Sequence, residues 1–337
     1  MNILDNSERK YEKMKHCFLI NPAAGKGKQC AETEKSIIAC CEAAGLDFDI
    51  YYTAGVGDAE EHIKAVCSEA DPATEFCFYA AGGDGTFSEV VNGAVHFANA
   101  SVGLIPIGTG NDFVRNFTNP TGFFDISAQI EGSEIALDLI KFNDRYSSNM
   151  LNTGFDCEVC RRVAKIKRNP AIPSKLAYLA GALIELIRKP GAKFEVSVDG
   201  GEVRDLDLLL TCICNGAFCG GGFHSGPYAD IADGVLDVCF IKNVTRLKFL
   251  KLLTPYKNGT YLSADGIEEI AEYIKCQRLD IKFKGFQSVC IDGEIEELED
   301  MSISVAPGAL RFRLPRGCEL IRAPKMSETE TKEPVEA

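Results

Sequence analysis

Three glycines and one aspartate between residues 82 and 86 are the part of the sequence that most directly suggests chemistry. The segment Gly82-Gly83-Asp84-Gly85-Thr86 follows a strand-like apolar run at 75–79, and a helical spacing of apolar residues begins at Phe87. Glycines at such a turn permit positive φ and remove the Cβ atoms that would keep a ligand from the backbone. Amide groups at the start of a helix can then face an anion. Because a carboxylate repels phosphate unless a cation lies between them, Asp84 predicts a Mg²⁺-nucleotide site, with a plain tight turn as the alternative.

Two other loops have the composition of a phosphate site. Residues 21–27 read Asn-Pro-Ala-Ala-Gly-Lys-Gly and follow an apolar strand, although their spacing is not that of a Walker A loop. Residues 107–112 read Ile-Gly-Thr-Gly-Asn-Asp and follow the apolar run at 102–105. Since ligands of open parallel sheets bind beyond the carboxyl ends of the strands, we expect these loops and residues 82–86 to meet in one crevice.

Paired carboxylates occur at two later Asp-Gly turns. Asp230 and Asp233 precede a strand that starts near Val235, and their oxygens could surround a hard cation, although a simple turn explains the same residues. Asp292 and Glu294 flank a glycine, and such a pair could take a proton from a hydroxyl group if it faces the nucleotide site. Taken alone, this second pair is also typical of a solvated turn.

The elements that must position the glycine loops alternate between strand and helix over the first third of the chain. Helical spacing occurs at 28–44. A second helix is expected to begin at Asp58, its N-cap, and to run to about residue 70. This alternation predicts a mostly parallel sheet with helices on both faces.

Beyond residue 136, strand-like runs dominate and Asp199-Gly200-Gly201 marks a hairpin. This part is expected to be an antiparallel β-sandwich with inserted helices. The expected helices lie at 174–187, 246–253 and 267–274. We therefore divide the chain into an α/β nucleotide-binding domain at 15–135, a sandwich domain at 136–322 and a polar, disordered tail at 323–337.

Composition and charge limit the classes of function. The 337 residues carry a formal net charge of −13 at pH 7, which argues against nucleic-acid binding. The sequence contains neither an apolar run long enough to span a bilayer nor an N-terminal secretion signal, so we expect a cytoplasmic protein. The cysteines, 15 in number, sit singly in apolar segments, where a thiol behaves as a small hydrophobe, and the one Cys157-x-x-Cys160 pair is expected to consist of buried, reduced thiols.

One segment departs from the acidic average. Residues 161–189 hold eight Lys and Arg residues but a single acid, Glu185, around an apolar stretch at 176–184. A basic, amphipathic stretch on an acidic protein can contact a lipid surface and give peripheral membrane association. The alternative is a helix that packs on the second domain with a solvated basic face.

Five motifs of this chain occur in the order found in diacylglycerol kinase catalytic-domain proteins. The chain most closely resembles the bacterial soluble lipid kinases (the diacylglycerol kinase and YegS-like branch), which are relatives of sphingosine kinases. The resemblance extends from about Lys15 to Arg322. A Gly-Gly-Asp-Gly element is shared with NAD kinases and phosphofructokinases, whereas the Gly-Thr-Gly-Asn-Asp element and the long sandwich domain indicate the lipid branch. The motifs are Asn21-Pro22-x-x-Gly25, Gly82-Gly83-Asp84-Gly85-Thr86, Gly108-Thr109-Gly110-Asn111-Asp112-Phe113, Asp233-Gly234 and Asp292-Gly293-Glu294.

The resemblance implies a Rossmann-like α/β N-terminal domain of the phosphofructokinase and NAD kinase type, an antiparallel β-sandwich C-terminal domain, and ATP bound between them. Asp84 and Asp112 would organise a catalytic Mg²⁺. Asp230, Asp233 and the carbonyl group of Val235 would hold a structural Mg²⁺. Residues implied to contact the nucleotide are Asn21, Pro22, Ala23, Ala24, Gly25, Thr53, Gly82, Gly83, Asp84, Gly85, Thr86, Phe87, Ser88, Thr109, Asn111 and Asp112.

The same resemblance implies the groups that act on the acceptor. Glu294, with Asp292 beside it, would take the proton from the lipid hydroxyl group, and turn geometry could reverse the two roles. One departure from the family pattern is Ala24, where a serine is usual, so one hydroxyl donor to the nucleotide is missing.

These observations lead us to expect an ATP- and Mg²⁺-dependent lipid kinase that transfers the γ-phosphoryl group to a lipid hydroxyl, with diacylglycerol as acceptor and phosphatidic acid as product. The alternatives are a kinase of a soluble substrate, such as an NAD kinase, and a non-catalytic nucleotide or lipid sensor. We expect contact with a membrane surface and none with nucleic acid. The sequence does not select among diacylglycerol, phosphatidylglycerol and a sphingoid base, and it leaves the oligomeric state open, a homodimer included.

Overall fold

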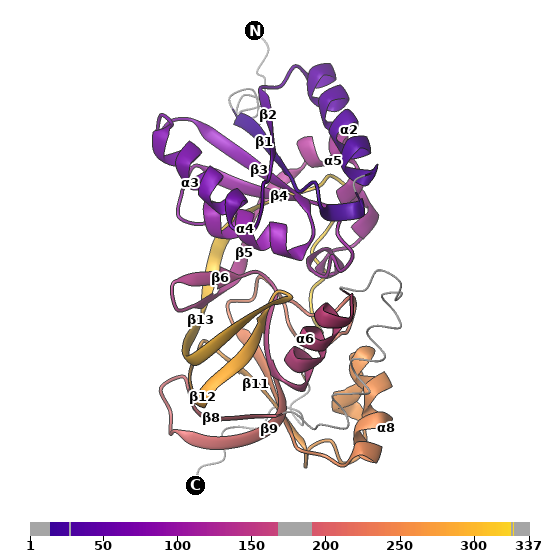
Figure 1. Cartoon of the computed structure of the whole chain (residues 1–337), viewed down its shortest axis with the longest axis vertical. Helices are drawn as coiled ribbons and strands as arrows, with labels where there is room; N and C mark the ends of the chain where they lie inside the picture. The colour runs from indigo at the N-terminus through magenta and orange to yellow at the C-terminus, as the bar shows by residue number, and fades with distance from the viewer. Residues whose placement is uncertain (1–13, 27, 168–190, 325, 327–337) are drawn as a thin grey trace. The chain divides into compact units, whose positions relative to one another are not determined.

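Two compact units make up the chain in a computed structural model that describes residues 14–26, 28–167, 191–324 and 326 (Figure 1). The first unit comprises residues up to 137 together with 308–321, and the second comprises residues 138–307 and those from 322 onward. The first unit therefore includes a C-terminal segment that lies inside the sandwich domain of the sequence-based division. This segment returns because the end of the last strand pairs with the first unit's sheet, at Phe312 and Val102.

A parallel sheet forms the centre of the first unit. Its strand order is β13–β4–β3–β1–β2, and the pairings are parallel. The run from Phe76 to Gly82 in β3 is buried throughout, as expected for a central strand covered on both faces. The elements are β1 (Met14–Ile20), η1 (Ala24–Lys26), α2 (Lys28–Ala44), β2 (Phe48–Tyr52), α3 (Asp58–Glu69), β3 (Glu75–Gly82), α4 (Asp84–Ala94), β4 (Ala100–Pro106), η2 (Phe113–Asn116), η3 (Pro120–Phe124) and α5 (Ile126–Ile130).

Helices cover both faces of this sheet. On one face, apolar residues of α2 and α5, such as Ile37 and Ile126, share a core cluster with strand residues such as Phe18. Figure 1 shows α3 and α4 on the other face, where Gly93 of α4 lies so close to α3 that a Cβ atom would stand 2.9 Å from Ile63. The predicted α/β architecture of the N-terminal part is confirmed.

The order of the strands creates a topological switch point between β1 and β3. The chain leaves β1 through α2 toward β2 on one side, and it leaves β3 through α4 toward β4 on the other. A crevice opens at such a reversal, beyond the carboxyl ends of the two strands. These ends are followed by Asn21 and by Gly83, so the switch point coincides with two of the three glycine loops.

Antiparallel strands make up most of the second unit. Their order is β11–β10–β9–β7–β12–β13, and β8 pairs with both β9 and β12. One core cluster, with Phe194, Phe240 and Ile303, fills the space between these strands, and another lies beneath two helices. The elements are β5 (Ser133–Phe142), β6 (Arg145–Ser147), β7 (Met150–Gly154), α6 (Phe155–Lys167), β8 (Ala192–Val198), β9 (Arg204–Cys214), β10 (Leu236–Lys242), α8 (Arg246–Lys257), η4 (Tyr261–Ser263), β11 (Ala271–Cys276), β12 (Arg278–Ile291) and β13 (Glu294–Leu314).

Two local predictions are wrong. The segment 267–274 was expected to be helical, but its second half begins strand β11, because antiparallel pairing with β10 outweighs the helical spacing of its isoleucines. Asp58 was expected to cap α3, but Gly57 occupies the cap position, with φ 85°. The Asp58 carboxylate instead accepts the Ala54 N–H at 2.7 Å and closes the preceding loop.

Several other predictions concern cysteines and membrane segments. All 15 cysteines are free thiols. Among the described residues, no helix is both long and apolar enough to cross a bilayer. The predicted helix at 174–187, most of the basic segment 161–189, and residues 325 and 327–337 of the predicted tail lie outside the described residues.

Candidate functional site

The three glycine loops of the first unit are joined by hydrogen bonds at the switch point. The Asn21 N–H donates to Ala81 O, and the Gly108 N–H donates to Gly82 O, each at 3.0 Å. The Asn21 side chain donates from Nδ2 to Thr86 Oγ1, also at 3.0 Å. The loops that follow three neighbouring strands thus form one continuous backbone surface, as the sequence predicted.

Glycine is required where these loops approach one another. A Cβ atom on Gly82 would stand 2.3 Å from Thr86 Oγ1, and one on Gly108 would stand 2.4 Å from the Cα atom of Gly83. These distances are far shorter than van der Waals contact, so no other residue fits there without movement of the backbone. Gly25 in the first loop adopts φ 57°, a conformation that favours glycine.

Asp84 organises the third loop through its carboxylate. Oδ2 accepts the Asn111 N–H at 2.8 Å, and Oδ1 accepts the Asp112 N–H at 2.9 Å. A Cβ atom on Gly110 would lie 2.6 Å from Asp84 Oδ2 and 3.8 Å from Asp112 Oδ2, so the two carboxylates converge on that glycine. Asp112 also pairs with Arg115 Nε at 3.2 Å.

These acidic residues have the donor chemistry that Mg²⁺ prefers. The carboxylates of Asp84 and Asp112 supply hard oxygen atoms on one side of Gly110. Asn111 Oδ1 is buried and accepts no hydrogen bond from a described residue, although its Nδ2 donates to Pro106 O and Gly108 O. An unsatisfied buried acceptor in the loop that carries Asp112 fits a water molecule or a cation.

The remaining residues of the predicted nucleotide site take different positions. The backbone N–H of Thr53 donates to Ile20 O at 2.9 Å, which places this residue beside the first loop. Thr109 is exposed, as are Pro22 and Ala23. The Phe87 side chain is 1 % exposed and packs on Phe113 with ring centroids 4.6 Å apart, so only its backbone can reach a ligand. Ala24, Gly83, Gly85 and Ser88 are partly exposed in or beside these loops.

In the second unit, Asp292 is held in a hairpin turn between β12 and β13. Asp292 and Gly293 both have positive φ, 47° and 98°, which is the signature of a type I′ turn. The Asp292 carboxylate accepts hydrogen bonds from Ser147 Oγ, from the N–H and Oγ of Ser148, and from the N–H groups of Asn149 and Met150, at 2.8–3.3 Å. Burial raises the pKa of this carboxyl group, and the hydrogen bonds oppose the shift.

Glu294 differs from its neighbour because its side chain is exposed and no hydrogen bond or ion pair within the described residues engages its carboxylate. Two carboxylate oxygens offer about four acceptor positions. Asp292 has filled these positions, whereas those of Glu294 remain open. Sequence reasoning did not identify Ser147, Ser148 or Asn149, since serines and asparagines before a strand carry no distinctive signal.

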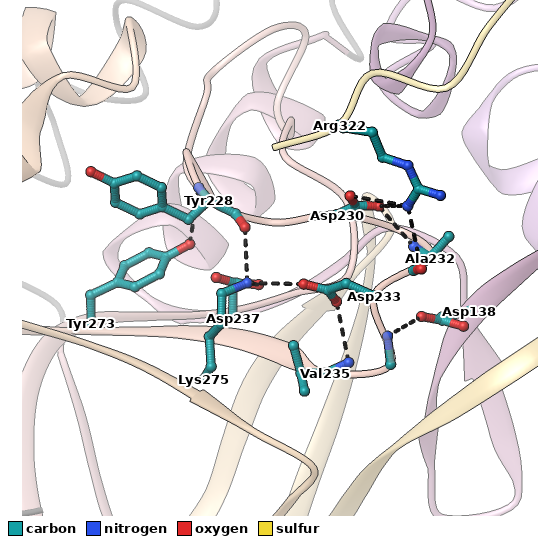
Figure 2. A network of polar contacts seen from close by, with 11 residues as sticks. Asp138, Tyr228, Asp230, Ala232, Asp233, Val235, Asp237, Tyr273, Lys275 and Arg322 are labelled. Atoms are coloured by element: carbon teal, nitrogen blue, oxygen red, sulfur yellow. Dashed lines mark hydrogen bonds and ion pairs between the residues drawn. The ribbon is translucent and has the colours of Figure 1, made fainter. Parts of the chain in front are cut away.

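The other predicted metal site is a network of acidic and basic side chains (Figure 2). The Lys275 ammonium group donates to Tyr228 O at 3.0 Å, Asp233 Oδ2 at 3.1 Å and Asp237 Oδ2 at 2.9 Å. Three acceptors satisfy the three donors of an ammonium group. Burial raises the pKa of Asp237 to about 7, although Lys275 lowers it.

Asp230 has a separate partner in this network. Its carboxylate pairs with Arg322 at 3.0 Å and accepts the Ala232 N–H. Val235 presents its N–H to Asp233 Oδ1 at 3.2 Å. Asp237 Oδ1 is buried and accepts no hydrogen bond from a described residue. The loop thus retains one acceptor for a cation, but a divalent ion would compete with Lys275 for Asp233.

Sequence reasoning missed the basic half of this network. Arg322 and Lys275 follow the acidic loop by many residues, and Lys275 lies on β11, directly opposite Asp237 of β10. It also missed Asp138, whose Oδ2 accepts the Gly234 N–H at 2.7 Å and thereby fixes the Asp-Gly turn. For Lys275, the alternation of apolar and polar residues after residue 270 could have indicated a strand.

Two family models match adjacent parts of the chain. Residues 15–142 match the diacylglycerol kinase catalytic domain. Residues 149–313 match the YegS C-terminal NAD kinase beta sandwich-like domain. The predicted two-domain fold agrees with both descriptions.

Proteins from several bacteria are similar over nearly the whole chain. A Pseudomonas aeruginosa protein named "Probable lipid kinase YegS-like" is 29 % identical over 301 residues, which cover 88 % of this chain and 95 % of the relative. A Mycobacterium tuberculosis diacylglycerol kinase is 27 % identical over 315 residues, covering 91 % and 97 %. The crystal structure of a diacylglycerol kinase from Bacillus anthracis has the same fold, with a TM-score of 0.65 at 20 % identity, covering 91 % of this chain and 98 % of that one.

Proposed function

Because the chain belongs to the diacylglycerol kinase catalytic-domain family of lipid kinases, we propose that it transfers the γ-phosphoryl group of ATP to the hydroxyl group of diacylglycerol. The observation that carries the proposal is the cluster of Asp84, Asn111 and Asp112 at the switch point of the sheet. Carboxylates beside a glycine-rich backbone surface favour a metal-bound polyphosphate over an uncharged ligand.

The binding roles follow from the positions of these groups. Backbone groups of the exposed or partly exposed residues 21–25, 83–85 and 108–110 would face the phosphates, while Thr53 borders the same surface. Mg²⁺ held by Asp84 and Asp112 would neutralise the charge of the phosphates, which is the main requirement of phosphoryl transfer. Lys26 and Lys28 are the only basic residues in the first loop and at the start of α2, so few basic side chains there could take over this task.

The acceptor step requires one base. The lipid hydroxyl oxygen bonds to the γ-phosphorus as the bond from phosphorus to the β–γ bridging oxygen breaks, and ADP leaves. The hydroxyl proton moves to Glu294, whose carboxylate is exposed and has open acceptor positions. Asp292, with its acceptor positions filled, acts as the positioning residue that fixes the turn. The product is phosphatidic acid.

We further propose that the acidic loop, with Asp230, Asp233 and the Val235 carbonyl group, takes up a structural Mg²⁺. Asp237 Oδ1, which is buried and accepts no hydrogen bond within the described part of the chain, supports a cation near this loop. Lys275 and Arg322 already neutralise part of its charge, so binding of the ion would rearrange their contacts.

The direct test is transfer of label from γ-labelled ATP to detergent-dispersed diacylglycerol by the purified full-length protein. We expect Glu294→Gln to lower kcat by about 10²–10⁴-fold, since it removes the base, and Asp84→Asn to abolish Mg²⁺-dependent turnover. Glu299→Gln, which changes another exposed glutamate of β13, is the control and should stay within about twofold of wild type.

Additional acceptors separate the remaining possibilities. Labelling of a total lipid extract identifies the preferred lipid, and NAD serves as the soluble acceptor. Label in NAD but in no lipid would favour the soluble-substrate kinase. Wild-type turnover in both Asp84→Asn and Glu294→Gln would refute the assigned roles.

A further inference from the structure

Helix α8 is firmly attached to the second unit along its inner face. Phe249 packs against Phe155 of α6, with ring centroids 4.6 Å apart. Tyr256 is buried, and its hydroxyl group donates to Asp156 at 2.9 Å. Thr245 caps the first turn by accepting the Lys248 N–H. The orientation of the helix is therefore fixed from both ends.

The outer face of α8 exposes large apolar side chains. Leu247 is 67 % exposed and Leu250 is 49 % exposed, and their spacing of three residues places them on the same side of the helix. Lys251, four residues after Leu247, is exposed on that side as well. Figure 1 shows α8 at the edge of its unit. Two leucines are thus left in water on a helix that already buries another apolar face.

The charge around these leucines is unusual for this chain. No Asp or Glu occurs between Asp237 and Asp265, although the sequence contains 49 of them among 337 residues. The same stretch contains five basic residues, three of which, Arg246, Lys248 and Lys251, lie in the first half of α8. The helix dipole disfavours cations in a first turn, so it does not account for the basic side chains of Arg246 and Lys248.

We propose that the outer face of α8, defined by Leu247, Leu250, Lys248 and Lys251, docks on a bilayer that contains anionic lipids. An interfacial helix inserts its apolar side chains at the boundary between headgroups and acyl chains while its cations meet lipid phosphates. Protruding leucines with flanking cations match that geometry. Among the described residues, neither Lys248 nor Lys251 forms an ion pair that docking would have to break.

The purpose of such docking rests on the proposed function, because a kinase of diacylglycerol must reach a substrate that stays in the membrane. The physical argument for docking, which uses the exposed leucines and the nearby cations, does not depend on the proposed function. The proposal places the membrane contact on α8 and not on the segment 161–189. Only the first part of that segment, up to Lys167 in α6, lies within the described residues.

Vesicle sedimentation with the full-length protein tests this surface, using phosphatidylcholine vesicles with and without phosphatidylglycerol. We expect Leu247→Ser with Leu250→Ser to lower the partition coefficient at least about tenfold on both vesicles. Lys248→Gln with Lys251→Gln should lower it about tenfold on the anionic vesicles and leave it unchanged on the neutral ones. These side chains are exposed or half-buried, so the melting temperature should not change.

Matched controls come from the same unit. Val203→Ser removes an apolar side chain that is 66 % exposed at the β8–β9 hairpin, and Lys193→Gln with Lys284→Gln removes two cations from strands. Both controls should bind vesicles within about twofold of wild type. Loss of binding in the controls as large as in the α8 variants would overturn the assignment to this helix.

Kinase assays distinguish a failure of this inference from a failure of the proposed function. On a short-chain diacylglycerol dissolved as monomers, the α8 variants should keep wild-type kcat/KM, and they should lose turnover only on vesicles. If the wild type phosphorylates no lipid but its vesicle binding depends on Leu247 and Leu250, the docking surface stands without the proposed function. Vesicle binding that survives both double substitutions refutes the docking surface, whichever lipid is phosphorylated.

Discussion

At the scale of single residues, Asp292 and Glu294 show how one turn can separate two carboxylates chemically. The type I′ turn directs Asp292 into a ring of donors from residues 147–150, while Glu294 begins the next strand with its side chain in solvent. The five hydrogen bonds already occupy the acceptor positions of the Asp292 carboxylate, so a lipid hydroxyl group would have to displace one of these donors to reach it. The geometry therefore favours Glu294 as the base.

This difference predicts that two conservative substitutions affect stability to different extents. Asp292→Asn replaces an accepting oxygen by an NH₂ group that faces backbone N–H donors, so we expect it to lower the free energy of unfolding by about 2–4 kcal/mol. Glu294→Gln touches no donor and should change that free energy by less than about 0.5 kcal/mol. Urea denaturation measures both changes, and amide exchange should accelerate at Ser148, Asn149 and Met150 in Asp292→Asn alone. Equal stability of the two variants would mean that the hydrogen bonds to Asp292 are not what holds the turn.

At the scale of elements, the acidic loop at 227–237 depends on a strand that follows it. Lys275 of β11 is directly opposite Asp237 of β10 and links it to Asp233. The Asp237 side chain is 1 % exposed, and a buried charge without a partner is strongly destabilising. The loop and the strand are thus one structural unit, although about 40 residues separate them.

Removal of this lysine gives a second stability prediction. Lys275→Met leaves Asp237 buried without its cation, and we expect the free energy of unfolding to fall by about 3–5 kcal/mol. Lys193→Met removes the cation of an exposed ion pair with Asp207 and should cost less than about 1 kcal/mol. Both are measured by urea denaturation, with and without Mg²⁺. A loss in Lys275→Met no larger than that in Lys193→Met would show that the network does not hold the loop.

The same elements show what the sequence could predict. The switch-point loops were predictable because each glycine segment follows an apolar run and precedes a helix, and topology then brings the strand ends together. The position of Lys275 could not be predicted. Residues 267–274 have the isoleucine spacing of a helix, and the pairing of β11 with β10 depends on contacts distant in sequence. The environment of Asp292 could be predicted only in part. The sequence showed the carboxylate pair, but it did not indicate the hydrogen-bond donors at 147–150. The site residues themselves stay predictions until the proposed variants are measured.

At the scale of the whole molecule, two buried groups titrate in opposite senses. His16, which is 1 % exposed and bonded to Tyr79 at 3.0 Å, has its pKa lowered to about 4 by burial and by the charge of Arg313. Between about pH 4 and 6.5 the unfolded state therefore binds more protons at this residue, and its contribution to stability is lost as pH falls through that window. Asp237 behaves inversely: burial raises its pKa to about 7, so its contribution is present at low pH and is lost as pH rises toward 7.

Between about pH 4 and 6.5, His16 makes the free energy of unfolding rise with pH, whereas Asp237 makes it fall. The pH dependence of wild-type stability therefore understates the effect of His16. Substitution His16→Gln removes the titration and keeps a polar group near Tyr79. We expect the wild type to lose up to about 3 kcal/mol more stability than His16→Gln between pH 7 and pH 4, as a histidine pKa lowered from 6.5 to about 4 requires. Asp237→Asn should have the reverse effect and make acid unfolding steeper. Urea denaturation at several pH values compares the three proteins, and curves that run parallel between wild type and His16→Gln would show that His16 does not titrate as its burial demands.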